Sequence, residues 1–269
     1  MGVVRTDKWL LKHNYHQQEL CGELLPYFKD AKEKELMHYL QRNGMYQSSS
    51  QGERDCKLLV AEEVWSKVGV LYEEYKNEWD GPDVSVFIFP MKKQNFFMRS
   101  HFKSGLAFSD KLFLFLSPNL NQHHLEALFI HEYHHVCRIA KQKKPIEEYT
   151  VADAIILEGF AEFTVQTMKG EGYLAPWTKR YSSKFLQSHW ESEFKKDAMV
   201  LKGEKKHDQM LYGGGRYPAM IGYCMGFHLV KKYVEENSFS LKSSFSLTSE
   251  RVFYNYFKNH VFLAVFSYS

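Results

Sequence analysis

The 269-residue sequence predicts a mostly helical α+β protein with one small sheet. Residues 9–79 carry apolar side chains at helical spacing, interrupted only by a polar loop near residues 44–52. The pattern then changes. Residues 84–89 form a short β-branched and aromatic run that ends at Pro90, and residues 105–108 and 111–116 flank a two-residue turn. We therefore expect a helical N-terminal region over residues 1–80, then a strand and a hairpin, then further helices.

The first helix expected after the hairpin covers residues 125–139 and is apolar on nearly all sides, so we expect it to be buried. It carries His131-Glu132-x-x-His135. At positions i and i+4 the two histidines share one helix face, where their ring nitrogens can bind one metal ion beside Glu132. His134 is a competing ligand. We prefer His135, because the i+4 pair leaves Glu132 flanking the metal, and interpret His134 as a core or supporting histidine.

The next apolar helix, opened by a capping-box variant at residues 150–153, carries Glu158 and Glu162 at i and i+4. A buried carboxylate needs a cation, and two histidines with one glutamate form a catalytic zinc set that leaves a position for water. We assign Glu158 as the third ligand of one zinc ion per chain. Glu162 is assigned to accept a hydrogen bond from the far ring nitrogen of a ligating histidine. The alternative is that both are ordinary solvated carboxylates or pair with lysines.

This combination of motifs resembles the gluzincin group of zinc peptidases, although Leu157 stands where many members have asparagine. Over nearly its full length, the chain is similar to the YjaZ-type predicted zinc-dependent proteases of bacilli and relatives. The matching segments are residues 6–10, 44–46, 79–83, 104–108, 131–138, 158–162, 175–178 and 222–226. The resemblance implies a zincin-like metallopeptidase region over residues 81–269, forming one continuous structural unit, in a bacterial protein that acts on peptides or proteins. Residues 259–269 depart from the family's C-terminus.

A zincin-like arrangement places an edge strand over the cleft, where it can pair with an extended substrate backbone. The expected sheet is followed directly by the expected metal-binding helix, as in that arrangement, and residues 105–108 are the candidate for the edge strand. The alternative is a sheet that only covers the core.

Zinc peptidases also supply a proton donor to the tetrahedral oxyanion. Our first candidate is Tyr223, followed by His228, Tyr217 and Arg216. A core tyrosine in a glycine-lined groove is the alternative for Tyr223.

Tyr223 lies on a helix that we expect Pro218 to open at its first position. On this helix Gly222 and Gly226, at i and i+4, allow another helix to approach closely.

The expected reaction is peptide hydrolysis with Glu132 as general base and then as proton donor to the leaving amine. Two alternatives stay open: a non-catalytic regulator that keeps the metal site for folding or partner binding, and a zinc hydrolase acting on a non-peptide amide. The sequence does not separate endopeptidase from aminopeptidase.

Composition is typical of a cytoplasmic enzyme. The formal net charge of +3 is too small to indicate nucleic-acid binding. No stretch approaches the roughly 18 apolar residues of a membrane span. Four cysteines without paired spacing are expected to be buried, reduced thiols; they are Cys21, Cys56, Cys137 and Cys224.

Overall fold

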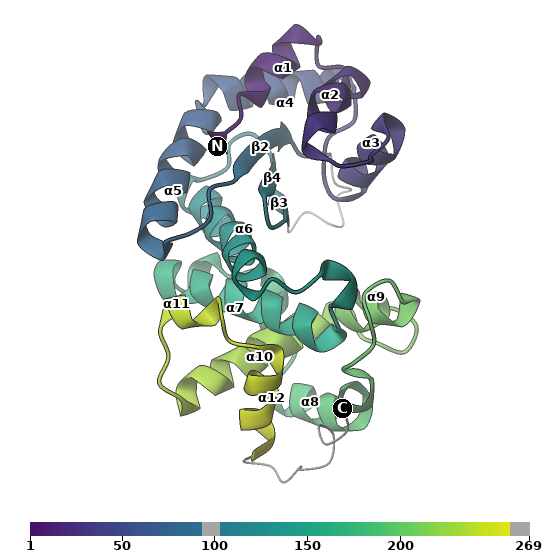
Figure 1. Ribbon diagram of the computed structural model, residues 1–269, viewed down its shortest axis with the longest axis vertical. Coiled ribbons are helices and arrows are strands. Elements are labelled where there is room, and N and C mark those ends of the chain that lie inside the picture. The colour runs from purple at the N-terminus through teal and green to yellow at the C-terminus, as the bar shows by residue number, and fades with distance from the viewer. Residues whose placement is uncertain (93–102, 259–269) are drawn as a thin grey trace. The chain divides into compact units, whose positions relative to one another are not determined.

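The computed structural model describes residues 1–92 and 103–258 (Figure 1). The chain forms two compact units, Met1–Val136 and Cys137–Ser269. Helices predominate in the described residues and one four-stranded sheet accompanies them, which confirms the mostly helical α+β class. The functional division expected at residue 80 stays a prediction, and the expected departure at residues 259–269 lies outside the described residues.

The first unit contains the sheet, whose strand order is β1-β2-β4-β3. The strands are β1 (Gly2–Val3), β2 (Ser85–Pro90), β3 (Lys103–Ala107) and β4 (Lys111–Leu116). β2 runs parallel to β1 and β4, whereas β3 is antiparallel to β4 and lies at the edge. All six residues of β2 and of β4 are buried, in line with the apolar runs of parallel strands covered on both faces. The strand and hairpin predictions are therefore confirmed.

Five helices of the first unit precede or surround this sheet (Figure 1). They are α1 (Thr6–Lys12), α2 (Gln17–Leu24), α3 (Glu33–Arg42), α4 (Ser50–Ala61) and α5 (Val64–Trp79). α1 and α4 contact β2, and α5 contacts β1. A buried chain of hydrogen bonds joins three elements: Trp65 Nε1 donates to Thr6 Oγ1 at 2.8 Å, and that hydroxyl donates to the Ile88 carbonyl at 2.5 Å. These hydrogen bonds link α1 and α5 to β2.

The 21-residue helix α6 (Gln122–Gln142) follows the sheet. Its residues from Tyr133 to Arg138 are all buried, as predicted for an interior helix. Tyr133 is anchored by stacking against Phe129 and Trp79, at centroid distances of 5.5 and 6.0 Å, and its hydroxyl donates to the Pro82 carbonyl at 2.9 Å. These contacts fix the rotation of α6 within the first unit.

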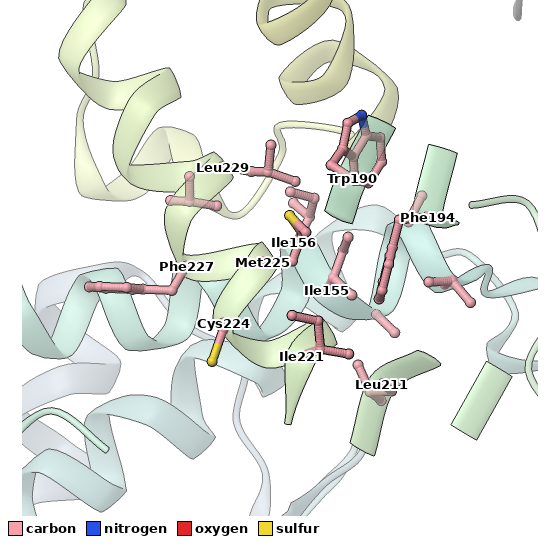
Figure 2. Packing of buried hydrophobic residues seen from close by; sticks show 14 of the residues in the cluster. Ile155, Ile156, Trp190, Phe194, Leu211, Ile221, Cys224, Met225, Phe227 and Leu229 are labelled. Carbon is pink, nitrogen blue, oxygen red and sulfur yellow. The ribbon is translucent and has the colours of Figure 1, made fainter. Parts of the chain in front are cut away.

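The second unit is built around the helices α7 (Val151–Lys169) and α10 (Ile221–Glu236), which make its most extensive contact. Its other helices are α8 (Ser183–His189), α9 (Lys205–Tyr212), α11 (Leu241–Ser244) and α12 (Ser249–Lys258). Figure 2 shows the buried hydrophobic cluster of this unit, with Ile155 and Ile156 of α7 beside Met225 of α10. The predicted capping box is confirmed, because Thr150 and Asp153 exchange side-chain and backbone hydrogen bonds at the start of α7.

One boundary prediction was wrong. α10 begins at Ile221, so Pro218 precedes the helix by three residues and does not open it. Met220 adopts a left-handed conformation with φ of 59°, and its N–H donates to the Tyr212 carbonyl at 2.8 Å. The hydrogen bond ties the start of α10 to the end of α9, and the left-handed residue prevents the helix from beginning earlier.

All four cysteines are buried and free, as predicted. Within residues 1–92 and 103–258, every helix is too short or too polar to cross a membrane. The expected location of the protein stays a prediction.

Candidate metal centre

His131 and His135 direct their Nε2 atoms toward the same point beside α6. The two atoms lie 3.1 Å apart, and the ring planes are nearly perpendicular at 85°. Two nitrogen ligands of one tetrahedral zinc ion lie about 3.3 Å apart, because each Zn–N bond measures about 2.0–2.1 Å. The histidine pair therefore has the spacing of two nitrogens that share a metal ion.

His134 occupies a different environment on the same helix. Its side chain is fully buried and its ring meets the Trp79 ring edge-on, with centroids 6.3 Å apart. This placement agrees with the interpretation of His134 as a core histidine. The i+4 partner His135 is the one that joins His131 in a possible ligand group.

Glu132 is buried beneath the edge strand of the sheet. A Cβ atom added to Gly105 of β3 would lie 2.5 Å from Glu132 Cγ and 2.8 Å from Glu132 Oε1. Such distances are below any ordinary van der Waals contact, so the strand backbone lies directly against the carboxylate. The candidate edge strand and the candidate general base are thus neighbours in the first unit.

The register of β3 determines which of its backbone groups point away from the sheet. Phe108 N–H donates to the Lys111 carbonyl at 2.9 Å, which makes this a hydrogen-bonded pair of the antiparallel ladder. Hydrogen-bonded and non-hydrogen-bonded pairs alternate. Gly105 and Ala107 consequently belong to non-hydrogen-bonded pairs with β4, and their N–H and C=O groups face the outer edge of the sheet.

Glu158, on α7, offers a third ligand. One ligand atom from each of His131, His135 and Glu158 lies within 4.8 Å of the other two, so this group could hold a metal ion. Two imidazole nitrogens and one carboxylate oxygen are a donor set of catalytic zinc sites. The chemistry of these residues therefore fits zinc.

Tyr223 is a neighbour of Glu158 within the second unit. Burial raises the pKa of the Tyr223 hydroxyl well above its ordinary value, and the charge of Glu158 and side-chain hydrogen bonds to Tyr212 and Glu158 raise it further. The Tyr212 ring lies 5.7 Å from that of Tyr223. Sequence reasoning missed Tyr212, because only the packing of α9 against α10 brings it to this position.

Glycines account for the proximity of Tyr223 to Glu158. A Cβ atom on Gly226 would overlap the Ile155 carbonyl oxygen, and one on Gly159 would lie 2.5 Å from the Gly226 carbonyl carbon. The backbones of α7 and α10 are therefore in direct contact, which confirms the close approach predicted from the glycine spacing. Glu158 precedes one of these glycines and Tyr223 lies one turn before the other.

The other candidate proton donors have different surroundings. Arg216 pairs with Glu193 at 3.1 Å and lies 3.6 Å from Asp197, and the Tyr217 hydroxyl lies 3.5 Å from the same aspartate. His228 has a lowered pKa, chiefly because burial disfavours its charged form. Of the four candidate donors, Tyr223 is the one that interacts with Glu158, through a side-chain hydrogen bond and through the charge of the carboxylate.

Glu162 is buried, with 3% of its surface exposed. Its Oε1 atom accepts a hydrogen bond from the Ala175 backbone N–H, beyond the end of α7. A backbone donor thus holds one carboxylate oxygen of Glu162 in place. Its assigned hydrogen bond with a ligating histidine stays a prediction.

The fold and these residues define a mostly helical α+β protein with a possible two-histidine, one-glutamate metal site. The chain belongs to the family described as "Predicted Zn-dependent protease (DUF2268)", whose family model matches residues 64–253. That range includes the histidine pair, Tyr223, and the glutamates Glu132, Glu158 and Glu162. The resemblance to the YjaZ-type predicted zinc-dependent proteases is therefore confirmed.

Two proteins of Bacillus subtilis (strain 168) are similar to this chain. It is 34% identical over 255 residues to "Uncharacterized protein YjaZ", covering 93% of this chain and 97% of that protein. It is 22% identical over 150 residues to "Uncharacterized protein YjfC", covering 52% of this chain and 50% of that protein. No solved structure matches significantly.

Proposed function

We propose that the protein is a gluzincin-like zinc peptidase that holds one zinc ion through His131, His135 and Glu158. The observation that carries this proposal is the convergence of the two Nε2 atoms and a glutamate oxygen, with a buried glutamate directly after the first histidine. Zinc bound there supplies Lewis-acid chemistry, since it lowers the pKa of a water molecule and polarises a carbonyl.

Glu132 is the general base and acid of the proposed reaction. Its carboxylate accepts a proton from the attacking water and then gives it to the leaving amine. A glutamate beside two histidines is positioned for this transfer, and its burial under β3 excludes most bulk water. Glu132 takes part in the chemistry without binding the metal.

A peptide fits the edge of the sheet in this proposal. The outward N–H and C=O groups of Gly105 and Ala107 can pair with an extended substrate backbone, as in other cases of strand addition. Because Gly105 lies against Glu132, a strand added there would run past the general base. This geometry favours a peptide over a small non-peptide amide as substrate.

Tyr223 and Glu162 have supporting roles. The raised pKa of Tyr223 keeps its hydroxyl protonated, so it can donate a hydrogen bond to the tetrahedral oxyanion. Glu162 accepts a hydrogen bond from the far ring nitrogen of one ligating histidine and fixes its tautomer. A zincin-like arrangement of residues 81–269 and a cytoplasmic location complete the proposal.

The test compares zinc-loaded wild-type protein, Glu132→Gln and Glu148→Gln on casein and on a peptide library. Glu148 is exposed, so Glu148→Gln is a matched change away from the site. We expect Glu132→Gln to keep zinc and fold while losing hydrolysis, because an amide cannot accept the proton. Absence of wild-type hydrolysis, with Glu132→Gln still complementing a deletion phenotype in cells, would instead establish the non-catalytic regulator.

A further inference from the structure

We infer that Gly105 is a positioning residue: the absence of a side chain at this point of β3 keeps the Glu132 carboxylate in its place beneath the strand. This inference rests on the proposed function of Glu132. It assigns to the edge strand a role in arranging the general base, in addition to its proposed pairing with substrate.

The backbone of β3 does not itself require glycine at this position. Positive φ angles occur at seven other glycines but not at Gly105, so an L-residue can adopt the same conformation. Glycine inside a strand is also unfavourable, because it loses more conformational freedom and offers no side chain for packing. The reason for glycine must therefore lie in the space around it.

That space is occupied by one side chain. The three atoms nearest to an added Cβ are Cδ, Cγ and Oε1, all of Glu132. At Gly226, by contrast, the nearest atoms belong to the backbone of Ile155. A methyl group at position 105 meets the movable end of a side chain, so the carboxylate moves and the strand stays.

Movement of the carboxylate has a specific kinetic consequence. Glu132 follows His131 on a rigid helix, so displacement of its side chain leaves the ligand positions of His131 and His135 unchanged. A misplacement of about 1 Å in a catalytic group can lower the rate about 100-fold. We therefore expect Gly105→Ala to lower kcat by about 10- to 100-fold while KM changes less than about 2-fold and zinc content is retained.

The matched control is Gly22→Ala in α2, where an added Cβ has no heavy atom within 4 Å. Gly22→Ala should leave kcat, KM and zinc content at their wild-type values. A crystal structure of Gly105→Ala should show Glu132 in a changed rotamer with β3 in place. An unmoved Glu132 carboxylate in that structure would overturn the inference, whatever the activity.

A stability cycle tests the same contact without any activity. Urea unfolding is measured for the wild type, Gly105→Ala, Glu132→Ala and the double variant. If Glu132 is the obstacle, Gly105→Ala destabilises the wild type but is neutral or stabilising in the Glu132→Ala background. Equal destabilisation in both backgrounds, or a double variant that fails to fold, would contradict the inference.

The two readouts also separate this inference from the proposed function. A wild type without hydrolysis would refute the peptidase, while the cycle and the Gly105→Ala structure would still decide whether Gly105 holds Glu132 in place.

Discussion

Gly226 of α10 packs directly against the carbonyl oxygen of Ile155 on α7. The reciprocal glycine, Gly159, faces the Gly226 backbone and the Val230 side chain, so each helix has a glycine where the two backbones meet. This contact brings Tyr223 of one helix beside Glu158 of the other. The placement of a candidate ligand and its neighbouring hydroxyl thus depends on two residues that carry no chemistry themselves.

Gly226→Ala should destabilise the second unit by about 1–3 kcal/mol. The added methyl group meets the Ile155 backbone, which cannot rotate away, so the two helices must separate. Urea unfolding measures the effect. Gly172→Ala is the control, since an added Cβ there has no heavy atom within 4 Å. Equal stability of the two variants would show that the helix contact is looser than described.

Tyr223→Phe should preserve fold and zinc while lowering kcat by about 100- to 1,000-fold, the usual effect of removing one oxyanion donor. Tyr217→Phe is the matched change, because that hydroxyl lies near Asp197. Steady-state kinetics on a peptide substrate measures both. If kcat is lower for Tyr217→Phe than for Tyr223→Phe, Tyr223 is not the proton donor.

The two acids of α7 should differ in their effect on zinc. Glu158→Ala removes a proposed ligand and should lose most of the bound metal. Glu162→Ala removes a partner of a ligand and should weaken affinity only about 10- to 100-fold. Competition with a chelating dye measures both affinities. The reverse order would exchange the two roles.

Asp83 makes the first unit sensitive to acid. Hydrogen bonds from Tyr72 and Lys76, together with the N-terminal amine, lower its pKa from 3.8 to about 2. Because the folded-state pKa is below the unfolded value, the stabilisation is complete above about pH 4 and is lost as the pH falls through about 2. Urea unfolding should show Asp83→Asn less stable than the wild type at pH 7, with a difference that shrinks steadily as the pH falls from about 4 through about 2. A stability difference that does not change over this range would refute the assignment.

The sequence predicted the parts of the molecule that depend on local spacing. The i+4 pair His131 and His135, the capping box at Thr150 and the 105–116 hairpin are each encoded within a few residues, and the structure has them as expected. The glycine pair on α10 also indicated a close helix contact, although the sequence did not identify Ile155 as its partner.

Features that depend on distant segments were not predictable. β1 has only two residues, too few to show a period, and exists because Gly2 and Val3 pair with β2. The start of α10 was misplaced because a hydrogen bond from Met220 to Tyr212 outweighs the local preference of Pro218. Likewise, the contact of Gly105 with Glu132 joins a strand to a helix, and nothing at either position alone indicates it.

The most direct test of the central claim is anomalous diffraction from crystals of the zinc-loaded protein, recorded on both sides of the zinc absorption edge. We expect one strong peak per chain within about 2.0–2.2 Å of His131 Nε2, His135 Nε2 and a Glu158 carboxylate oxygen. A peak bound to other residues, or no peak in protein soaked with zinc, would contradict the proposed metal centre and the hydrolytic function built on it.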